Sequence, residues 1–185
     1  MPVLKAEPAI HPINLLKDPF ASVENGRWWA VYTKARQEKA FARHLLTMDI
    51  PFYLPLIPKE NLIRGRRVQS FIPLFNGYVF LFGDKGERTQ GLKTNRTSTI
   101  LSVDDQAQIL IDLRQISTMI DAGAALTVES RLIPGDLVRI KSGPMAGLEG
   151  TVVIRRGQTR LLVAVQMLQQ GVSVEIDDFQ LESLN

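Results

Sequence analysis

The 185-residue sequence contains no cysteine and only two histidines, His11 and His44. The absence of cysteine excludes disulfides, thiolate metal sites and a cysteine nucleophile. Because the two histidines lie far apart along the chain, they form no pair at metal-ligand spacing. We therefore expect no metal site.

Long hydrophobic runs are also missing. No apolar run approaches the roughly 18 residues that a membrane-spanning helix needs, and the N-terminus lacks the basic-then-apolar order of a secretory signal. Together with the lack of cysteine, this pattern fits a reducing compartment. We expect a cytoplasmic monomer with no membrane partner.

Sequence motifs of catalysis are absent as well. The chain has no Gly-x-Ser-x-Gly elbow, no phosphate-binding Gly-x-x-x-x-Gly-Lys-Ser/Thr loop and no Gly-x-Gly-x-x-Gly after a strand. The acidic pairs Asp104-Asp105 and Asp177-Asp178 are adjacent in sequence, and adjacent residues of a strand point to opposite faces. We expect a protein that is not an enzyme and uses no cofactor.

The charge of the chain is unevenly distributed, although the formal net charge is only +3. Residues 27–122 hold fourteen Lys/Arg and nine Asp/Glu, a net of +5, whereas residues 133–185 hold five and six, a net of −1. A basic first half suggests a polyanion as its partner. Because the excess is modest, auxiliary contact with nucleic acid is expected rather than tight autonomous binding.

The most aromatic stretch of the chain is Phe71–Phe82, which contains four of its eight phenylalanines. Its apolar second half, Tyr78 to Phe82, is typical of a strand covered on both faces. In a strand, Tyr78, Phe80 and Phe82 share one face. Such a face is either core or a docking surface for apolar side chains of a partner.

A strand at 28–33 and a helix at about 36–48 precede this stretch. The strand is rich in aromatic and β-branched residues, and the apolar residues of the helix recur at helical spacing. The other helical face gathers Arg36, Lys39 and Arg43. This basic stripe is either a solvated face or a surface for nucleic acid.

Extended segments and a second helix complete the first half. An extended segment at 51–62 is followed by the turn Arg64-Gly65-Arg66-Arg67 and a returning strand. This basic prong either touches phosphate or keeps an edge hairpin soluble. A short strand at 99–103 follows, and residues 105–122 have the periodicity of a helix. The order predicts an α+β fold, a mainly antiparallel sheet with flanking helices.

From residue 133 the pattern changes to short strands separated by glycine-rich turns, which predicts a small SH3-like β-barrel. Residues 160–170 suit a strand or a helix by periodicity, but the surrounding glycines and the β-branched Val152-Val153-Ile154 favour strands. We predict a flexible N-terminal extension at 1–26, a first domain at 27–122, a linker at 123–132 and a barrel at 133–185.

Two groups of motifs together resemble the NusG family of transcription factors. Residues 28–32, the Ile63-Arg64-Gly65-Arg66-Arg67 turn and Pro73–Phe80 look like the family's N-terminal (NGN) domain. Pro134-Gly135-Asp136 and the loop Gly143–Gly150 are similar to the KOW motif of its C-terminal barrel. The arginine hairpin followed by Pro-Leu-Phe is closest to the specialised antiterminators related to RfaH.

The resemblance implies a transcription elongation or antitermination factor that suppresses pausing or termination. Its N-terminal domain would dock on the clamp helices of the largest subunit of RNA polymerase, and it would touch the non-template DNA strand. By position, the polymerase-binding residues would be Tyr32, Phe75, Tyr78 and Phe80. The nucleic-acid-binding residues would be Lys34, His44 and Arg96, with the stripe of Arg36, Lys39 and Arg43 beside them.

The resemblance also implies a partner for the barrel, a ribosomal protein or Rho, at Met145 and Leu148. One departure is that Arg88-Thr89-Gln90-Gly91 stands where the antiterminators have a His-Thr-Thr-Thr run that contacts the opposite side of the polymerase cleft. An alternative is a KOW protein that binds RNA or the ribosome directly. That alternative predicts basic residues on the barrel, whose net charge is −1.

Overall fold

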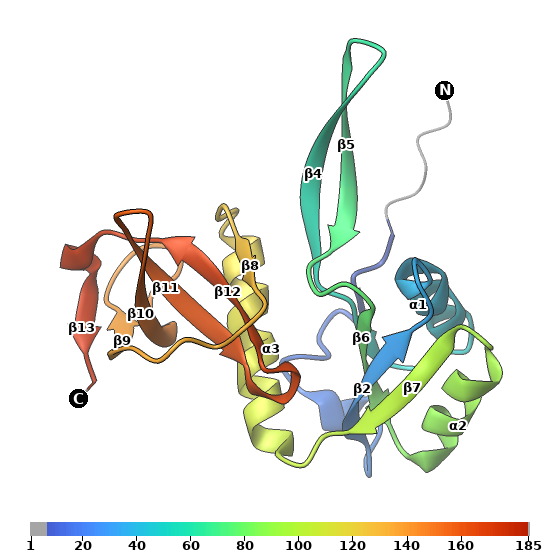
Figure 1. Ribbon diagram of the computed structural model, residues 1–185. Helices are drawn as coiled ribbons and strands as arrows, with labels where there is room; N and C mark the ends of the chain where they lie inside the picture. Colours follow the sequence, from blue (N-terminus) through green and yellow to red (C-terminus); the bar gives the residue numbers. More distant parts are fainter. Residues whose placement is uncertain (1–6, 185) are drawn as a thin grey trace. The chain divides into compact units, whose positions relative to one another are not determined.

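A computed structural model describes residues 7–184 of the chain. The chain forms two compact units, Met1–Gln106 and Ala107–Asn185 (Figure 1). Among the described residues, no helix is both long enough and apolar enough to cross a membrane.

The first unit is built on a five-stranded antiparallel sheet in the order β1-β3-β6-β2-β7. Strand β6 lies at the centre, and its residues after Tyr78 are buried, as expected for an apolar strand covered on both faces. Its neighbour β2 pairs with it from Arg27↔Gly83 to Tyr32↔Tyr78. The strands are β1 (Ile10–His11), β2 (Arg27–Thr33), β3 (Phe52–Tyr53), β6 (Tyr78–Gly83) and β7 (Thr97–Ser102).

Two helices accompany this sheet, α1 (Glu38–Thr47) and α2 (Lys85–Lys93). Helix α1 contributes Phe41, Ala42 and Leu45 to a hydrophobic cluster with strand residues, so its apolar face is the one predicted by periodicity. The helix begins at Glu38 rather than at Arg36. The reason is that Arg36 has a φ of 59°, which a right-handed helix excludes.

A long hairpin of β4 (Leu56–Ile63) and β5 (Arg66–Pro73) forms a separate two-stranded sheet. Figure 1 shows it projecting from the end of the first unit's sheet. Arg64 and Gly65 form its tip with φ values of 49° and 75°. Two central residues with positive φ are the requirement of a type I′ turn, whose twist matches that of the two strands.

The N-terminal segment packs on the first unit, in contrast to the predicted flexible extension at 1–26. Ile10 and His11 pair with β3, Leu15 and Leu16 are buried, and a 3₁₀ turn, η1, spans Pro19–Ala21. The segment lacks sequence periodicity because it is anchored by two buried leucines and one short strand pairing. Residues 1–6 of the expected extension lie outside the described residues.

The second unit contains helix α3 (Gln106–Asp121), which starts on the last residue of the first unit, and a six-stranded antiparallel sheet. The sheet has the order β13-β9-β10-β11-β12-β8 and is not closed into a barrel. Residues 158–165 form a strand, so the strand interpretation of the ambiguous segment is confirmed there. The elements are β8 (Thr127–Glu129), β9 (Leu137–Ile140), β10 (Glu149–Arg155), β11 (Gln158–Val165), η2 (Gln166–Leu168), β12 (Gln170–Glu175), η3 (Asp178–Gln180) and β13 (Leu181–Ser183).

The predicted fold class, α+β with a mainly antiparallel N-terminal sheet and a small SH3-like C-terminal β-barrel, is confirmed, with the difference that the six-stranded C-terminal sheet is not closed. The division of the chain differs in detail from the predicted domains. Helix α3 groups with the second unit, and the expected linker at 123–132 contains β8, which pairs with β12. Within the second unit, the backbone N–H of Gln166 donates to Asp112 Oδ2 (2.9 Å) and that of Glu149 to Gln115 Oε1 (2.8 Å). Where the independently folding domains begin and end stays a prediction.

Candidate functional site

Two tyrosines stand side by side at one end of the first unit's sheet. Tyr32 near the end of β2 pairs in register with Tyr78 at the start of β6, and their ring centroids are 5.1 Å apart with an interplanar angle of 52°. Tyr32 is 44% exposed and Tyr78 is half-buried. This tyrosine pair is therefore an amphipathic surface that a protein partner can contact.

Gly77 makes room for the Tyr32 ring. Its φ is +84°, and a Cβ added there would lie 2.6 Å from Tyr32 Cε2, closer than van der Waals contact allows. The Asn76-Gly77 turn that the sequence predicts before β6 is thus required both by backbone conformation and by this close approach.

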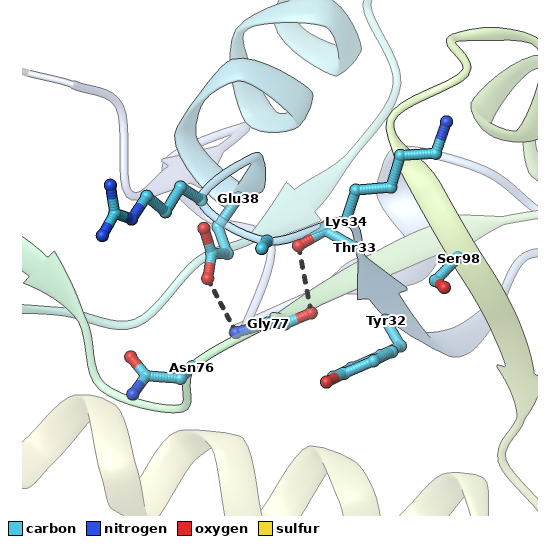
Figure 2. Close-up of a pocket in the computed structure, with 9 residues that line it drawn as sticks. Tyr32, Thr33, Lys34, Glu38, Asn76, Gly77 and Ser98 are labelled. Carbon is cyan, nitrogen blue, oxygen red and sulfur yellow. Dashed lines mark hydrogen bonds between the residues drawn. The ribbon is translucent and has the colours of Figure 1, made fainter.

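A pocket of about 490 Å³ opens beside the tyrosine pair (Figure 2). The Glu38 carboxylate, in a residue only 9% exposed, accepts the backbone N–H of Gly77 at 2.7 Å. The Thr33 hydroxyl donates to the Gly77 carbonyl at 3.3 Å. These bonds tie α1 and β2 to the turn and so preorganise the pocket, which is lined by Tyr32, Thr33, Lys34, Ala35, Arg36, Glu38, Asn76, Gly77 and Ser98.

Phe75 and Phe80, which the resemblance assigns to the docking surface, are 1% and 0% exposed. Phe80 lies in the middle of β6, which has neighbouring strands on both sides and is buried from Val79 to Gly83. The two phenylalanines therefore belong to the core of the structure, and Tyr32 and Tyr78 are the members of the expected set that reach the surface. Strand alternation alone could not separate an exposed strand end from its buried middle.

The predicted basic residues are partly brought together. Arg96 Nε donates to His44 Nδ1 (3.0 Å), and Arg96 Nη1 donates to Gln37 Oε1 (2.5 Å). A small pocket of about 160 Å³ lies here, lined by Ala40, Arg43, His44, Thr47 and Arg96. We call Arg43, His44 and Arg96 the basic cluster.

His44 is set up as a hydrogen-bond donor by this arrangement. Because Nδ1 accepts the hydrogen bond from Arg96 Nε, Nε2 is the ring nitrogen that can donate to a ligand. Neither side-chain partner of Arg96 is a carboxylate, so no anion cancels the charge of its guanidinium group there. The cluster therefore offers a cation and an N–H donor, the groups that bind phosphate and base edges.

Arg43 of this cluster and the other predicted cations differ in their partners. Lys34 Nζ donates to Asn95 Oδ1 at 2.8 Å, and Arg43 forms an ion pair with Glu7. Lys39 lies on α1, half-buried. Arg36 is exposed but precedes the helix in a left-handed conformation, so the predicted helical stripe contains only Lys39 and Arg43.

Sequence reasoning missed the uncharged residues that orient these cations. Gln37 holds Arg96, and Asn95 holds Lys34. Gln37 occupies the N-cap position of α1 without a side-chain capping bond. No local signal identifies it, because its partner is 59 residues away in the chain.

The loop between β9 and β10 contains the residues expected to bind a partner of the barrel. Met145 is half-buried, but Leu148 is only 4% exposed and belongs to the core. The Leu148 carbonyl accepts from Ile140 N (2.9 Å), which folds the loop back on β9. Met145 alone of the two can present an apolar contact.

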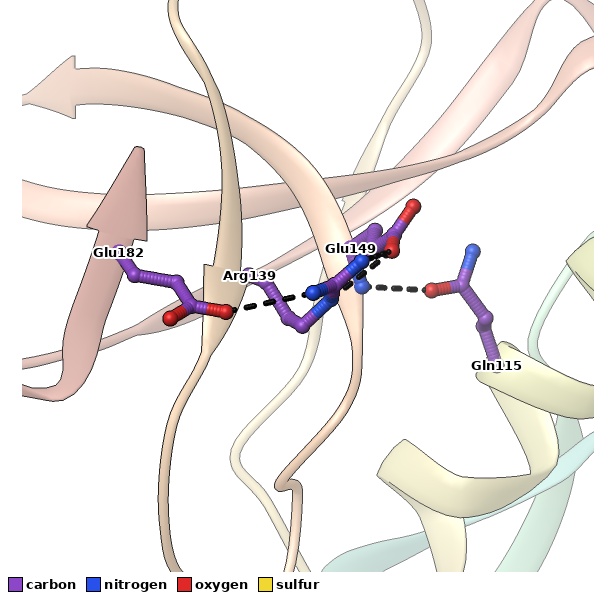
Figure 3. Close-up of polar contacts among 4 residues, drawn as sticks. All are labelled: Gln115, Arg139, Glu149 and Glu182. Atoms are coloured by element: carbon purple, nitrogen blue, oxygen red, sulfur yellow. Dashed lines mark hydrogen bonds and ion pairs between the residues drawn. The ribbon is translucent and has the colours of Figure 1, made fainter. Parts of the chain in front are cut away.

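Two arginines of the second unit, Arg139 and Arg155, are paired with acids, whereas Arg160 donates to the neutral Ser173 and Thr127. Figure 3 shows Arg139 between Glu149 and Glu182, with N–O distances of 2.6 and 3.3 Å. The hydrogen bond and the charge of Glu149, assisted by Glu182, raise the pKa of Arg139 further above its usual value. Arg155 likewise pairs with Glu129 at 3.1 Å. Arg139 and Arg155 are therefore neutralised within the unit.

Metal-ligand chemistry is not assembled in the part of the chain that the structure describes, since no three His, Asp or Glu side chains gather there as a possible ion site.

Comparisons with known proteins agree with the motif resemblance. Residues 26–122 match the family described as "Transcription termination factor nusG". The chain is 25% identical over 174 residues to the transcription termination/antitermination protein NusG of Pseudomonas aeruginosa, covering 85% of this chain and 98% of that protein. It is 25% identical over 180 residues to the same protein of Deinococcus radiodurans, covering 81% and 95%.

Among solved structures, the crystal structure of an MjSpt4:Spt5 complex (conformation B) is similar at 16% identity. The match covers 85% of this chain and 97% of that chain, with a TM-score of 0.26.

Proposed function

The chain belongs to the NusG family of transcription termination and antitermination factors, and from that premise we propose that it docks on RNA polymerase through the tyrosine pair. The family's proteins are transcription factors without enzymatic activity. The proposed target is the clamp helices of the largest polymerase subunit, and the proposed effect is suppression of pausing or termination. Such a factor acts in the cytoplasm, with the bacterial polymerase.

One observation carries this proposal: the exposed Tyr32, packed at a tilt against the Tyr78 ring and fitted against Gly77. Exposed aromatic residues held in one conformation are typical of binding hot spots, because little side-chain entropy is lost when a partner covers them. The buried Phe75 and Phe80 support the pair from within and make no contact of their own in this proposal.

The decisive experiment is co-elution of the purified chain with core RNA polymerase. We expect Tyr32→Ala and Tyr78→Ala each to weaken binding by about 1–3 kcal/mol, the usual range for a hot spot. Phe71→Ala removes another exposed aromatic ring, 45% exposed on the hairpin, and is the matched control. Equal affinity in all three folded variants would return the tyrosines to a structural role.

The basic cluster supports a second contact, with the non-template DNA strand. Arg96 and His44 present one cation and one N–H donor next to Arg43, and Lys34 lies close by through Asn95 and the Arg96 carbonyl. We assign Lys39 and Arg36 to the periphery of this contact. In this arrangement the cluster orients DNA after the tyrosine pair has bound the polymerase.

Helix α2 contains the Arg88-Thr89-Gln90-Gly91 segment that replaces the His-Thr-Thr-Thr run of the antiterminators related to RfaH, and its contacts bear on that difference. Arg88 lies over the Trp29 ring, with its guanidinium carbon 5.1 Å from the centroid, and the Thr89 hydroxyl donates to the Lys85 carbonyl at 2.7 Å. Since these side chains make contacts within the first unit, we propose that the contact across the polymerase cleft is lost or made by other residues. Membership of the RfaH-related branch remains a proposal based on the hairpin motif.

For the second unit we propose recruitment of a ribosomal protein or Rho, with Met145 as the apolar contact. The alternative, direct binding of RNA by the sheet, is weakened by the pairing of Arg139 and Arg155 with glutamates. Elution of the chain with ribosomes but never with polymerase would favour that alternative.

A further inference from the structure

The β4–β5 hairpin contributes little to the core of the first unit. Its base is anchored by the buried Leu56 and Leu74, with Leu74 N donating to the Pro55 carbonyl at 2.8 Å. From Pro58 to Phe71, in contrast, no residue is buried. The hairpin is therefore an appendage whose length the stability of the unit does not require.

Positive charge is concentrated at the tip of this hairpin. Residues 59–70 hold four cations, Lys59, Arg64, Arg66 and Arg67, and one anion, Glu60, for a net charge of +3. All three arginines are exposed, and within residues 7–184 none of them forms an ion pair. The charge of the tip is therefore available to a polyanion.

Aliphatic side chains alternate with the arginines on both faces of the ribbon. Leu62 is opposite Arg67 on one face, and Ile63 is opposite Arg66 on the other. Leu62 is 74% exposed and Ile63 is 53% exposed. A tip built only for solubility would not expose these apolar groups, so each face offers both a cation and an apolar contact.

We propose that this hairpin binds B-form duplex DNA through its major groove, with the tip arginines on phosphates and the aliphatic residues toward the base edges. The major groove of B-DNA is about 12 Å wide and admits a two-stranded β-ribbon. The deep, narrow major groove of duplex RNA does not admit side chains. Single strands are bound by aromatic stacking platforms, and residues 59–70 contain no aromatic residue.

This site is distinct from the basic cluster and does not depend on docking to the polymerase. Its test therefore uses the full chain and free nucleic acid. Fluorescence anisotropy measures the binding of a labelled DNA duplex of about two helical turns at about 50 and about 200 mM salt. The same measurement is made with a duplex RNA of the same sequence.

The test variant combines Arg64→Gln, Arg66→Gln and Arg67→Gln. Because each phosphate contact contributes about 0.9 to the slope of log K against log salt, we expect the slope to fall by about two to three and the affinity at low salt to fall at least tenfold. The matched control, Lys85→Gln with Arg131→Gln and Lys141→Gln, removes three exposed charges elsewhere and should retain most of the affinity. The far-ultraviolet circular dichroism of both variants should equal that of the natural chain.

Three results would overturn the proposal. The first is DNA binding that is absent in the natural chain or unchanged in the hairpin variant. The second is an equal loss in the control, which would indicate only net charge. The third is duplex RNA bound as tightly as duplex DNA. A chain that fails to bind polymerase but shows the expected DNA results would refute the proposed function and leave this inference standing.

Discussion

Two cations of the first unit and two arginines of the second unit have partners of opposite kinds, although Arg43 and Arg160 show that neither kind is confined to one unit. In the first unit, Arg96 and Lys34 are held by the neutral side chains of Gln37, His44 and Asn95. In the second, Arg139 and Arg155 are held by glutamates. A neutral partner orients a cation and leaves its charge for a ligand, whereas a carboxylate cancels it. The chemistry of the partner, more than the number of arginines, therefore decides whether the charge of a cation stays available to a ligand.

The largest expected effect tests whether a buried carboxylate of the second unit contributes to its free energy of unfolding. Asp112 is 2% exposed and accepts from Gln166 N. Asp112→Ala leaves this donor without its partner, so we expect a loss of about 1–3 kcal/mol in the free energy of unfolding, measured by urea denaturation. Asp121→Ala, at an exposed position of the same helix, is the control. Similar midpoints for the two variants would argue against a structural role for Asp112.

The next effect tests whether the uncancelled charge of Arg96 in the first unit contributes to activity. Arg96→Gln removes the cation of the basic cluster, and we expect antipausing activity in a transcription assay to fall by about tenfold or less, most strongly at low salt. Binding to the polymerase should be nearly unchanged. Arg139→Gln removes an arginine that is already neutralised and should leave activity as it was. Loss of polymerase binding in Arg96→Gln would instead indicate that the basic cluster contacts the polymerase and not DNA.

A smaller effect is expected when an arginine of the second unit loses its acidic partner. Glu149→Gln removes the main acidic partner of Arg139 and leaves a neutral amide in its place. If charge cancellation is what keeps the second unit from polyanions, this variant should bind heparin at a higher salt concentration than the natural chain. Glu175→Gln, an exposed acid on β12, controls for the change in net charge. Equal elution of the two variants would contradict our interpretation of the pairing.

The smallest effect concerns the N-terminus of α2, where Asp84 and Glu87 form a capping box. The hydrogen bond with the Glu87 side chain, and then those from the backbone of Gly86 and Glu87, lower the pKa of Asp84 below its usual 3.8. The stabilisation is therefore complete above pH 3.8 and is lost as the pH falls through the lowered value. Amide exchange at Gly86 and Glu87 should rise only in that acid range.

Asp84→Asn is the control for this titration, because it keeps an N-cap acceptor and cannot ionise. Its amide exchange should not change between pH 5 and the acid range beyond the change intrinsic to exchange. A transition in the natural chain that begins well above pH 3.8 would show that another group is responsible.

Local sequence determined most of the secondary structure. Periodicity located α1 and α3, and β-branched and aromatic composition located β2, β6 and the strands of the second unit. The Arg64-Gly65 turn followed from a glycine placed between two extended segments. These features depend on interactions between residues a few positions apart, so a single sequence contains enough information for them.

Tertiary structure alone decided which of these residues reach the surface. Some of these features join distant parts of the chain: β1 pairs with β3, and arginines find Gln37 or Glu149 as partners. Others depend on how strands pack, such as the burial of Phe80 and Leu148. Sequence patterns report the period of an element and the type of each residue. Burial and charge pairing depend on what the folded chain brings against that element. The sequence could therefore predict candidate surfaces but not which of their residues are exposed.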